Sequence, residues 1–188
     1  MNRLDYRDRL KKILLTHSVM RGDFTLASGK KSNLYVDCRL TTLRAEAMPL
    51  VGRLLLEEIR KKGWQPKAVG GLTMGADPVV CALARESLEY GCEMNGFLIR
   101  KESKKHGREQ YLEGLAETEG VDCVILDDVC TTGGSTVTAI ERAKGAGMNV
   151  LGAACIVDRE QGGREAIEAL GCGFVTLYTL AELLESLD

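Results

Sequence analysis

The residues with the clearest chemical potential lie in one run, V-D-C-V-I-L-D-D-V-C-T-T-G-G-S-T, at residues 121–136. Asp127 and Asp128 end an apolar stretch. Small and hydroxyl-bearing residues follow them: Thr131, Thr132, Gly133, Gly134 and Ser135. Glycines let backbone N–H groups face a ligand, and a helix that begins here adds a partial positive charge. The run therefore predicts a phosphate site at the start of a helix.

The two carboxylates suggest what accompanies the phosphate. Asp127 and Asp128 cannot be phosphate ligands because like charges repel, but they suit hydroxyl groups or a hydrated divalent cation. Phosphate, hydroxyls and a metal together describe a phosphorylated sugar. The P-loop pattern G-x-x-x-x-G-K-[ST] and the dinucleotide pattern G-x-G-x-x-G are both absent from the sequence. A simple helix N-cap is the alternative, but a cap does not require two preceding carboxylates.

A second run, R-K-E-S-K-K-H-G-R-E-Q-Y-L-E-G at residues 100–114, concentrates positive charge. Its basic side chains are Arg100, Lys101, Lys104, Lys105 and Arg108, with His106 among them. In a chain of formal net charge -2, this is a local positive field suited to a polyanion. Gly107 and the lack of apolar periodicity predict a mobile loop of the kind that closes over substrate. From these residues alone, a solvated basic loop or a minor nucleic-acid patch stays open.

Three shorter segments are weaker signals. G-G-L-T-M-G-A-D-P at 70–78 and S-G-K-K-S at 28–32 place glycines beside polar residues. The first suits either pyrophosphate or backbone packing, and lysines in turns like the second are common. Arg159 follows an apolar run, where it suits a substrate carboxylate, or an ion pair with Asp158 or Glu160.

The seven cysteines show no metal-binding pattern. They stand at 38, 81, 92, 123, 130, 155 and 172, without a C-x-x-C pair or a histidine cluster, so we do not expect a structural zinc site. An odd number predicts free thiols in a reducing compartment. Cys130 lies inside the phosphate run, where a helix N-terminus can lower a thiol pKa. We favour a small, unreactive side chain there.

Composition limits the classes of protein. At 188 residues and 45% hydrophobic content, the chain suits a single domain, residues 1–188, with a packed core. The net charge of -2 and 5% aromatic content argue against a general nucleic-acid or membrane-surface binder. No apolar run approaches the roughly 20 residues that span a bilayer, and the N-terminus lacks a signal-peptide core. We therefore expect a cytoplasmic protein.

The elements that must position these residues follow from periodicity. Apolar residues at helical spacing predict helices over 4–17 and about 45–62, the second beginning near Pro49 or kinked there. The segment 24–39 between them predicts a hairpin or loop-linked strands. Further along, strands are expected at 67–72, 95–100, 121–128 and 149–158, with helices at 78–90 and 134–144. This alternation predicts an α/β fold with a parallel sheet covered by helices.

Ligands of such sheets bind at the carboxyl ends of the strands. Segments 70–77, 100–108 and 127–136 all follow predicted strands. We therefore expect the three segments to meet at one rim of the sheet.

The order of these motifs resembles the orotate phosphoribosyltransferases, a branch of the type I phosphoribosyltransferase family, over nearly the whole chain. V-I-L-D-D-V-C-T-T-G-G-S-T at 124–136 is similar to the family's phosphoribosyl-pyrophosphate (PRPP) motif. R-K-E-S-K-K-H-G at 100–107 looks like the catalytic loop of the orotate branch, F-T-L-A-S-G-K-K-S at 24–32 like its N-terminal segment, and I-V-D-R-E follows at 156–160. The resemblance implies a mainly parallel central sheet flanked by helices, an N-terminal hood at about 1–40 and a flexible loop at about 101–114.

The resemblance also implies an activity and a site. The reaction is Mg²⁺-dependent transfer of the 5-phosphoribosyl group from PRPP to orotate, giving orotidine 5′-monophosphate and pyrophosphate in UMP biosynthesis. The implied catalytic residues are Lys104, His106, Asp127 and Asp128. The implied PRPP site consists of Arg100, Lys101, Lys104, His106, Asp127, Asp128, Val129, Cys130, Thr131, Thr132, Gly133, Gly134 and Ser135. Thr131 and Arg159 match the orotate-contacting positions.

Two further implications concern the metal and the assembly. Mg²⁺ would be held mainly by PRPP and water, with Asp127 and Asp128 nearby and no direct protein ligand assigned. Lys104 and His106 would reach the neighbouring subunit's site, which implies a homodimer. Partners other than the two small substrates, such as nucleic acid or membrane, are not implied.

The chain departs from the resemblance at two places, and two other functions stay open. Many relatives carry lysine at Ala27 and an aromatic-lysine pair at Thr73-Met74, so possible pyrophosphate contacts are missing here. A phosphoribosyltransferase for another base would share the 127–135 run, although 100–107 and Arg159 favour orotate. A regulator that senses PRPP would not need the basic loop.

Overall fold

The computed structural model describes residues 3–25, 31–102 and 111–185. Its centre is a six-stranded sheet with the order β5-β4-β3-β6-β7-β8. The strands are β3 (Ala68–Leu72), β4 (Asn95–Ile99), β5 (Leu112–Glu113), β6 (Asp122–Cys130), β7 (Asn149–Asp158) and β8 (Gly173–Thr179). Neighbouring strands are parallel except for the short β5, which pairs antiparallel with β4. The predicted α/β class with a mainly parallel sheet is confirmed.

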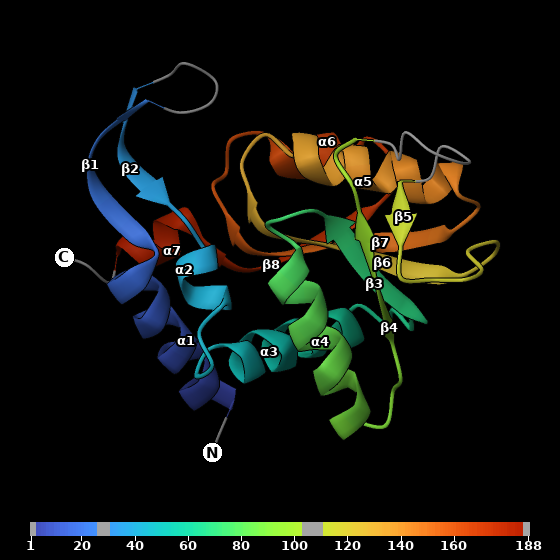
Figure 1. Ribbon diagram of the computed structural model, residues 1–188. Coiled ribbons are helices and arrows are strands. Elements are labelled where there is room, and N and C mark those ends of the chain that lie inside the picture. Colours follow the sequence, from blue (N-terminus) through green and yellow to red (C-terminus); the bar gives the residue numbers. More distant parts are fainter. Residues whose placement is uncertain (1–2, 26–30, 103–110, 186–188) are drawn as a thin grey trace.

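Helices cover both faces of this sheet (Figure 1). One face carries α3 (Met48–Lys61) and α4 (Asp77–Glu89), and the other carries α5 (Gly134–Gly145) and α6 (Gly163–Glu168). Alternate side chains of β6 enter opposite layers. Val124 and Leu126 pack in the core cluster that includes α3 and α4, whereas Cys123 and Ile125 pack in the cluster that includes α5. Burial on both faces explains why this strand is continuously apolar.

The N-terminal elements stand beside the sheet. They are α1 (Arg3–His17), β1 (Val19–Thr25), β2 (Lys31–Val36) and α2 (Arg39–Thr42). β1 and β2 pair antiparallel and project away from α1 in Figure 1. The predicted first helix is confirmed, and so is a pair of strands. The first of them, β1, begins at Val19, ahead of the predicted segment 24–39. None of the described helices is long and apolar enough to cross a membrane.

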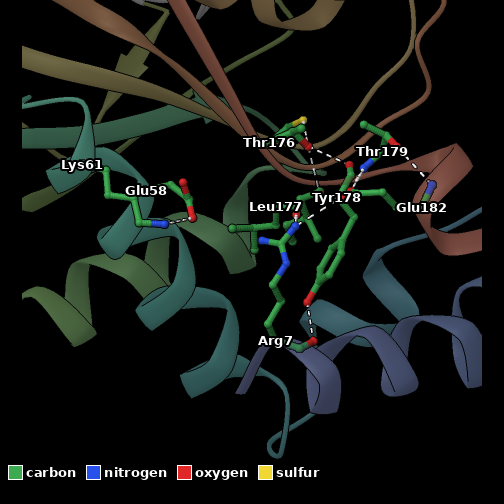
Figure 2. Close-up of polar contacts among 10 residues, drawn as sticks. Arg7, Glu58, Lys61, Thr176, Leu177, Tyr178, Thr179 and Glu182 are labelled. Carbon is green, nitrogen blue, oxygen red and sulfur yellow. Dashed lines mark hydrogen bonds and ion pairs between the residues drawn. The ribbon is translucent and has the colours of Figure 1, made fainter. Parts of the chain in front are cut away.

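Contacts between α1 and the last strand fix these N-terminal elements to the core (Figure 2). The hydroxyl of Tyr178 donates to the carbonyl oxygen of Arg7 at 2.6 Å. In return, the Arg7 guanidinium donates to the carbonyl oxygen of Leu177 and lies 4.7 Å from the centroid of the Tyr178 ring. Thr179 then caps α7 (Leu180–Leu184) in a reciprocal capping box with Glu182. These contacts join the two ends of the described chain.

Candidate active site

A cavity of about 870 Å³ opens at the carboxyl ends of β3, β6 and β7. Residues 72–75 line it after β3, Lys101 lines it beyond β4, and Asp127, Asp128 and Ser135 line it at the junction of β6 and α5. β2 and the turn that follows it line another side. For the described residues, the predicted meeting of the three strand-end segments at one rim is confirmed, with the segment 100–108 represented by Lys101.

A smaller hollow of about 220 Å³ is lined by Asp127 and residues 129–135, most of which also line the cavity. Gly133 has a φ of +79°, in the left-handed region that favours glycine, and α5 begins at the next residue. A Cβ on Gly133 would also lie only 3.0 Å from the carbonyl oxygen of Gly163. The first N–H groups of a helix have no partner within it and carry a partial positive charge. The hollow therefore suits an anion of phosphate size, as the sequence predicts.

The paired carboxylates are held by hydrogen bonds at the base of the cavity. Asp127 accepts from the Asp128 N–H and from the Thr136 hydroxyl, both at 3.0 Å. Its side chain is buried, and burial together with the charge of Asp128 raises the pKa of Asp127 to about 7. Burial also raises the pKa of Asp128, against the effect of a hydrogen bond from the Val129 N–H and the charge of Arg39. Perturbed carboxylates in a cleft are typical of a functional site.

An ion pair that the sequence analysis did not single out also lines the cavity. Arg39 donates through Nε and Nη2 to the two carboxylate oxygens of Asp37, each at 2.9 Å. This pairing lowers the pKa of Asp37 and raises that of Arg39. The positive charge of Arg39 also favours the ionised form of Asp128. The only sequence signal was an acid and an arginine two residues apart, at the end of the segment 24–39 predicted as strands.

The basic run contributes one described side chain to the cavity, that of Lys101. Arg100 instead pairs with Glu113, at 3.5 Å between Nη1 and Oε1. Lys104, His106 and most of the loop predicted at about 101–114 lie outside the described residues.

Arg159 lines the same cavity from the end of β7, although only 8% of its surface is exposed. Its backbone N–H donates to the carbonyl oxygen of Cys130 at 2.8 Å. Within the described part of the chain, its buried Nε has no hydrogen-bond partner. Asp158 is paired with Arg164, at 3.7 Å between carboxylate and guanidinium, and no described ion pair links Asp158 to Arg159. The side chain of Arg159 is thus available to a ligand in the cavity that Thr131 also lines.

The remaining predictions concern Cys130 and the glycines after β3. Cys130 is buried, and this burial raises its thiol pKa to about 12, which supports the interpretation of an unreactive side chain. Gly70 and Gly71 serve packing. A Cβ on Gly70 would collide with the ring of Phe97, and a Cβ on Gly71 would collide with the carbonyl oxygen of Leu126. Gly75 alone of the three lines the cavity.

No group of three or more His, Cys, Asp or Glu residues in the described ranges could hold a metal ion. Asp127 and Asp128 nevertheless bring two carboxylates to the cavity. Mg²⁺ commonly binds through one or two carboxylates together with substrate phosphates and water. The residues therefore fit a cation held mainly by a phosphorylated substrate.

A parallel α/β sheet with a phosphate-sized hollow next to paired carboxylates is the arrangement of a phosphoribosyltransferase. Sequence comparison agrees, because the family described as "Phosphoribosyl transferase domain" matches residues 41–169. Curated relatives narrow the assignment. An orotate phosphoribosyltransferase of Synechocystis sp. is 42% identical, over 94% of this chain and 88% of that protein. One of Rhodopseudomonas palustris is 40% identical, over 99% of this chain and 100% of that protein.

Solved structures agree with the curated sequences. An orotate phosphoribosyltransferase of Mycobacterium tuberculosis in complex with Fe(III) dicitrate superposes with a TM-score of 0.84 at 38% identity, covering 95% of this chain and 98% of that chain. The same enzyme in complex with PRPP gives a TM-score of 0.80 at 36% identity, with the same coverage. The chain belongs to the orotate phosphoribosyltransferase family.

Proposed function

We propose that this chain transfers the 5-phosphoribosyl group of PRPP to orotate, in pyrimidine nucleotide biosynthesis. The bond between C1 of the ribose and the pyrophosphate oxygen breaks, and a bond from C1 to a ring nitrogen of orotate forms as that nitrogen releases its proton to water. The observation that carries the proposal is the position of Arg159, whose buried Nε is unpaired within the described chain. It lines the same cavity as the phosphate-sized hollow, and a guanidinium matches the carboxylate of orotate.

The residues divide between the parts of PRPP. In the proposal, residues 131–135 hold the 5′-phosphate through the N–H groups and hydroxyls at the start of α5. Asp127 and Asp128 accept hydrogen bonds from the ribose hydroxyls. Thr131 and Arg159 hold orotate. The first two assignments rest on the hollow and on the hydrogen-bonded carboxylate pair beside it.

The basic run serves the leaving group. As the bond to pyrophosphate breaks, negative charge grows on pyrophosphate and positive charge on the sugar. Cations fixed near the departing oxygens stabilise this transition state more than the ground state. We assign this role to Lys101, Lys104 and His106, with Arg100 assisting. The exposed pair between Arg100 and Glu113 is worth at most about 1 kcal/mol, so it does not hold Arg100 away from pyrophosphate.

Mg²⁺ is part of the proposal, with Asp127 and Asp128 as the nearest carboxylates. When bound, it supplies a positive charge that neutralises the pyrophosphate oxygens. The protein's share is to keep the carboxylate pair in place, which the hydrogen bonds from Thr136 and the backbone achieve.

We further propose a single domain over 1–188 that acts as a homodimer in the cytoplasm, with Lys104 and His106 completing the neighbouring site. Exposed large apolar side chains support a partner: Leu40 on α2 is 48% exposed, Leu43 directly after α2 64% and Met74 67%. Met74 itself lines the cavity. All seven cysteines are free, which suits a reducing compartment.

A base profile tests the function. The protein is mixed with PRPP and Mg²⁺ and with orotate, uracil or adenine, and the ultraviolet absorbance of each base is followed. We expect loss of orotate alone. The variant Arg159→Leu should lower kcat/KM for orotate by at least about 10²-fold, because a charge-assisted bidentate contact is lost. Turnover of uracil or adenine without orotate would overturn the proposal.

A further inference from the structure

We propose that Arg142 is a positioning residue that fixes both ends of the segment between Lys101 and Tyr111 and thereby sets Lys101 in the cavity. This inference rests on the proposed function, because it takes Lys101 as a pyrophosphate contact. Arg142 lies outside the sequence motifs from which the site was predicted, because the nearest of them, residues 127–136, ends six positions earlier.

Arg142 contacts the chain on each side of that segment. Its guanidinium donates to the carbonyl oxygen of Arg100 and, through Nη2, to that of Lys101 at 3.1 Å. The same group lies 4.1 Å from the centroid of the Tyr111 ring. The two ends also meet directly, because the Arg100 N–H donates to the Tyr111 carbonyl oxygen at 2.8 Å. One side chain thus contacts both backbone segments, residues 100–101 and Tyr111, which we together call the neck.

The charges around this neck indicate that the contact is specific. Arg100 and Lys101 are cations, and within the described residues Arg142 forms no ion pair. A third cation beside two others is unfavourable unless acceptors compensate it. Here two carbonyl oxygens and an aromatic face do so. Lysine cannot reproduce this arrangement, because only a planar guanidinium donates to two acceptors while it stacks on a ring.

The position of Arg142 on α5 connects two parts of the site. The first turn of α5, from Gly134, lines the phosphate-sized hollow. Arg142 stands eight residues later, about 12 Å along the same helix. A rigid helix therefore sets the distance between the 5′-phosphate site and the neck that carries Lys101. Misplacement of a charge by about 1 Å can reduce catalysis 10²-fold.

A double-mutant cycle tests whether Arg142 acts through Lys101. We expect Arg142→Ala to lower kcat about tenfold, and Arg142→Lys to retain an intermediate value. In a Lys101→Ala background, Arg142→Ala should lower kcat by less than about a further twofold, because the effects of coupled residues are not additive. The matched control is Lys144→Ala, which removes another α5 cation that donates to a backbone carbonyl, that of Leu170. Equal effects of the Ala variants at 142 and 144, or full additivity with Lys101→Ala, would overturn the inference.

Amide hydrogen exchange provides a readout that does not depend on orotate. In Arg142→Ala, peptides that contain residues 98–102 and 111–113 should exchange faster, whereas peptides of β6 and β7 should not. Lys144→Ala should leave both sets unchanged. Unaltered exchange at the neck would refute the role of Arg142 even if the wild-type protein consumes orotate. A wild-type protein that ignores orotate would instead refute the proposed function and leave the exchange result standing.

Discussion

The carboxylate of Asp128 lies against the bare α-carbon of Gly75. A Cβ at position 75 would come within 2.5 Å of the Asp128 Oδ1 atom. Glycine at this position therefore lets the loop after β3 approach the end of β6 without displacing the Asp128 carboxylate. This close approach brings the loop and the carboxylate pair into the same cavity.

The first prediction concerns this contact. Gly75→Ala should displace the Asp128 side chain and lower kcat/KM for PRPP by about tenfold, because misplaced groups cost catalysis steeply. The melting temperature should change little, since the atom that must move is the end of a side chain. Gly145→Ala, which meets nothing within 4 Å, is the control and should leave turnover intact. Equal turnover in the two variants would show that Gly75 serves packing alone.

The second prediction is a pH dependence of stability. The pKa of Asp127 is about 7 in the folded protein against an ordinary value of 3.8. The folded state therefore binds this proton more tightly than the unfolded state does, and stability falls as pH rises from about 4 to 7. Asn at position 127 does not titrate, so Asp127→Asn lacks this loss of stability. As the pH rises from about 4 to 7, the unfolding free energy of the variant should therefore increase relative to that of the wild type by a few kcal/mol.

Urea unfolding at pH 4.5 and pH 7.5 measures this gain. Asp8→Asn, a substitution at an exposed carboxylate on α1, provides the control for loss of a negative charge. A constant difference between Asp127→Asn and the wild type at both pH values would contradict the raised pKa.

The third prediction concerns the basic run. Lys104→Ala should lower kcat by at least about 10²-fold, the usual size of a lost electrostatic contact to a transition state. Lys62→Ala, at an exposed lysine after α3, should leave kcat unchanged. Steady-state kinetics with orotate and PRPP provide the measurement. A Lys104→Ala enzyme as fast as the wild type would remove Lys104 from the mechanism.

The fourth prediction concerns the contact of α1 with β8. Tyr178→Phe removes the hydroxyl that donates to Arg7 and leaves a carbonyl oxygen short of one donor. We expect a loss of about 1–2 kcal/mol in unfolding free energy. Tyr35→Phe is the control, since within the described chain the hydroxyl of Tyr35 forms no hydrogen bond and the residue is 36% exposed. Identical denaturation midpoints for the two variants would show that the hydroxyl of Tyr178 is dispensable.

Much of the sheet could be predicted because its strands are continuously apolar and alternate with helices of ordinary length. β6 and α5 lie within two residues of their predicted bounds, and β7 spans the predicted 149–158. β8 and the short helices α2, α6 and α7 were not predicted. A helix of four to six residues shows little periodicity, so its sequence pattern is weak.

The site was predictable where one run of sequence builds it. The phosphate-sized hollow at 129–135 needs only a strand, a glycine turn and a helix start, all contiguous. The pair of Asp37 with Arg39 and the neck contact of Arg142 were missed, because they depend on how separate segments meet in space. The sequence also suggested Asp158 as an ion-pair partner of Arg159, whereas in the structure Asp158 forms an ion pair with Arg164.

Product stoichiometry shows directly whether the protein transfers the phosphoribosyl group from PRPP to orotate. The protein is incubated with PRPP, orotate and Mg²⁺, and orotate, pyrophosphate and nucleotide are quantified over time by chromatography. We expect one orotidine 5′-monophosphate and one pyrophosphate to form for each orotate consumed. Release of pyrophosphate without the nucleotide, or no consumption of orotate, would contradict it.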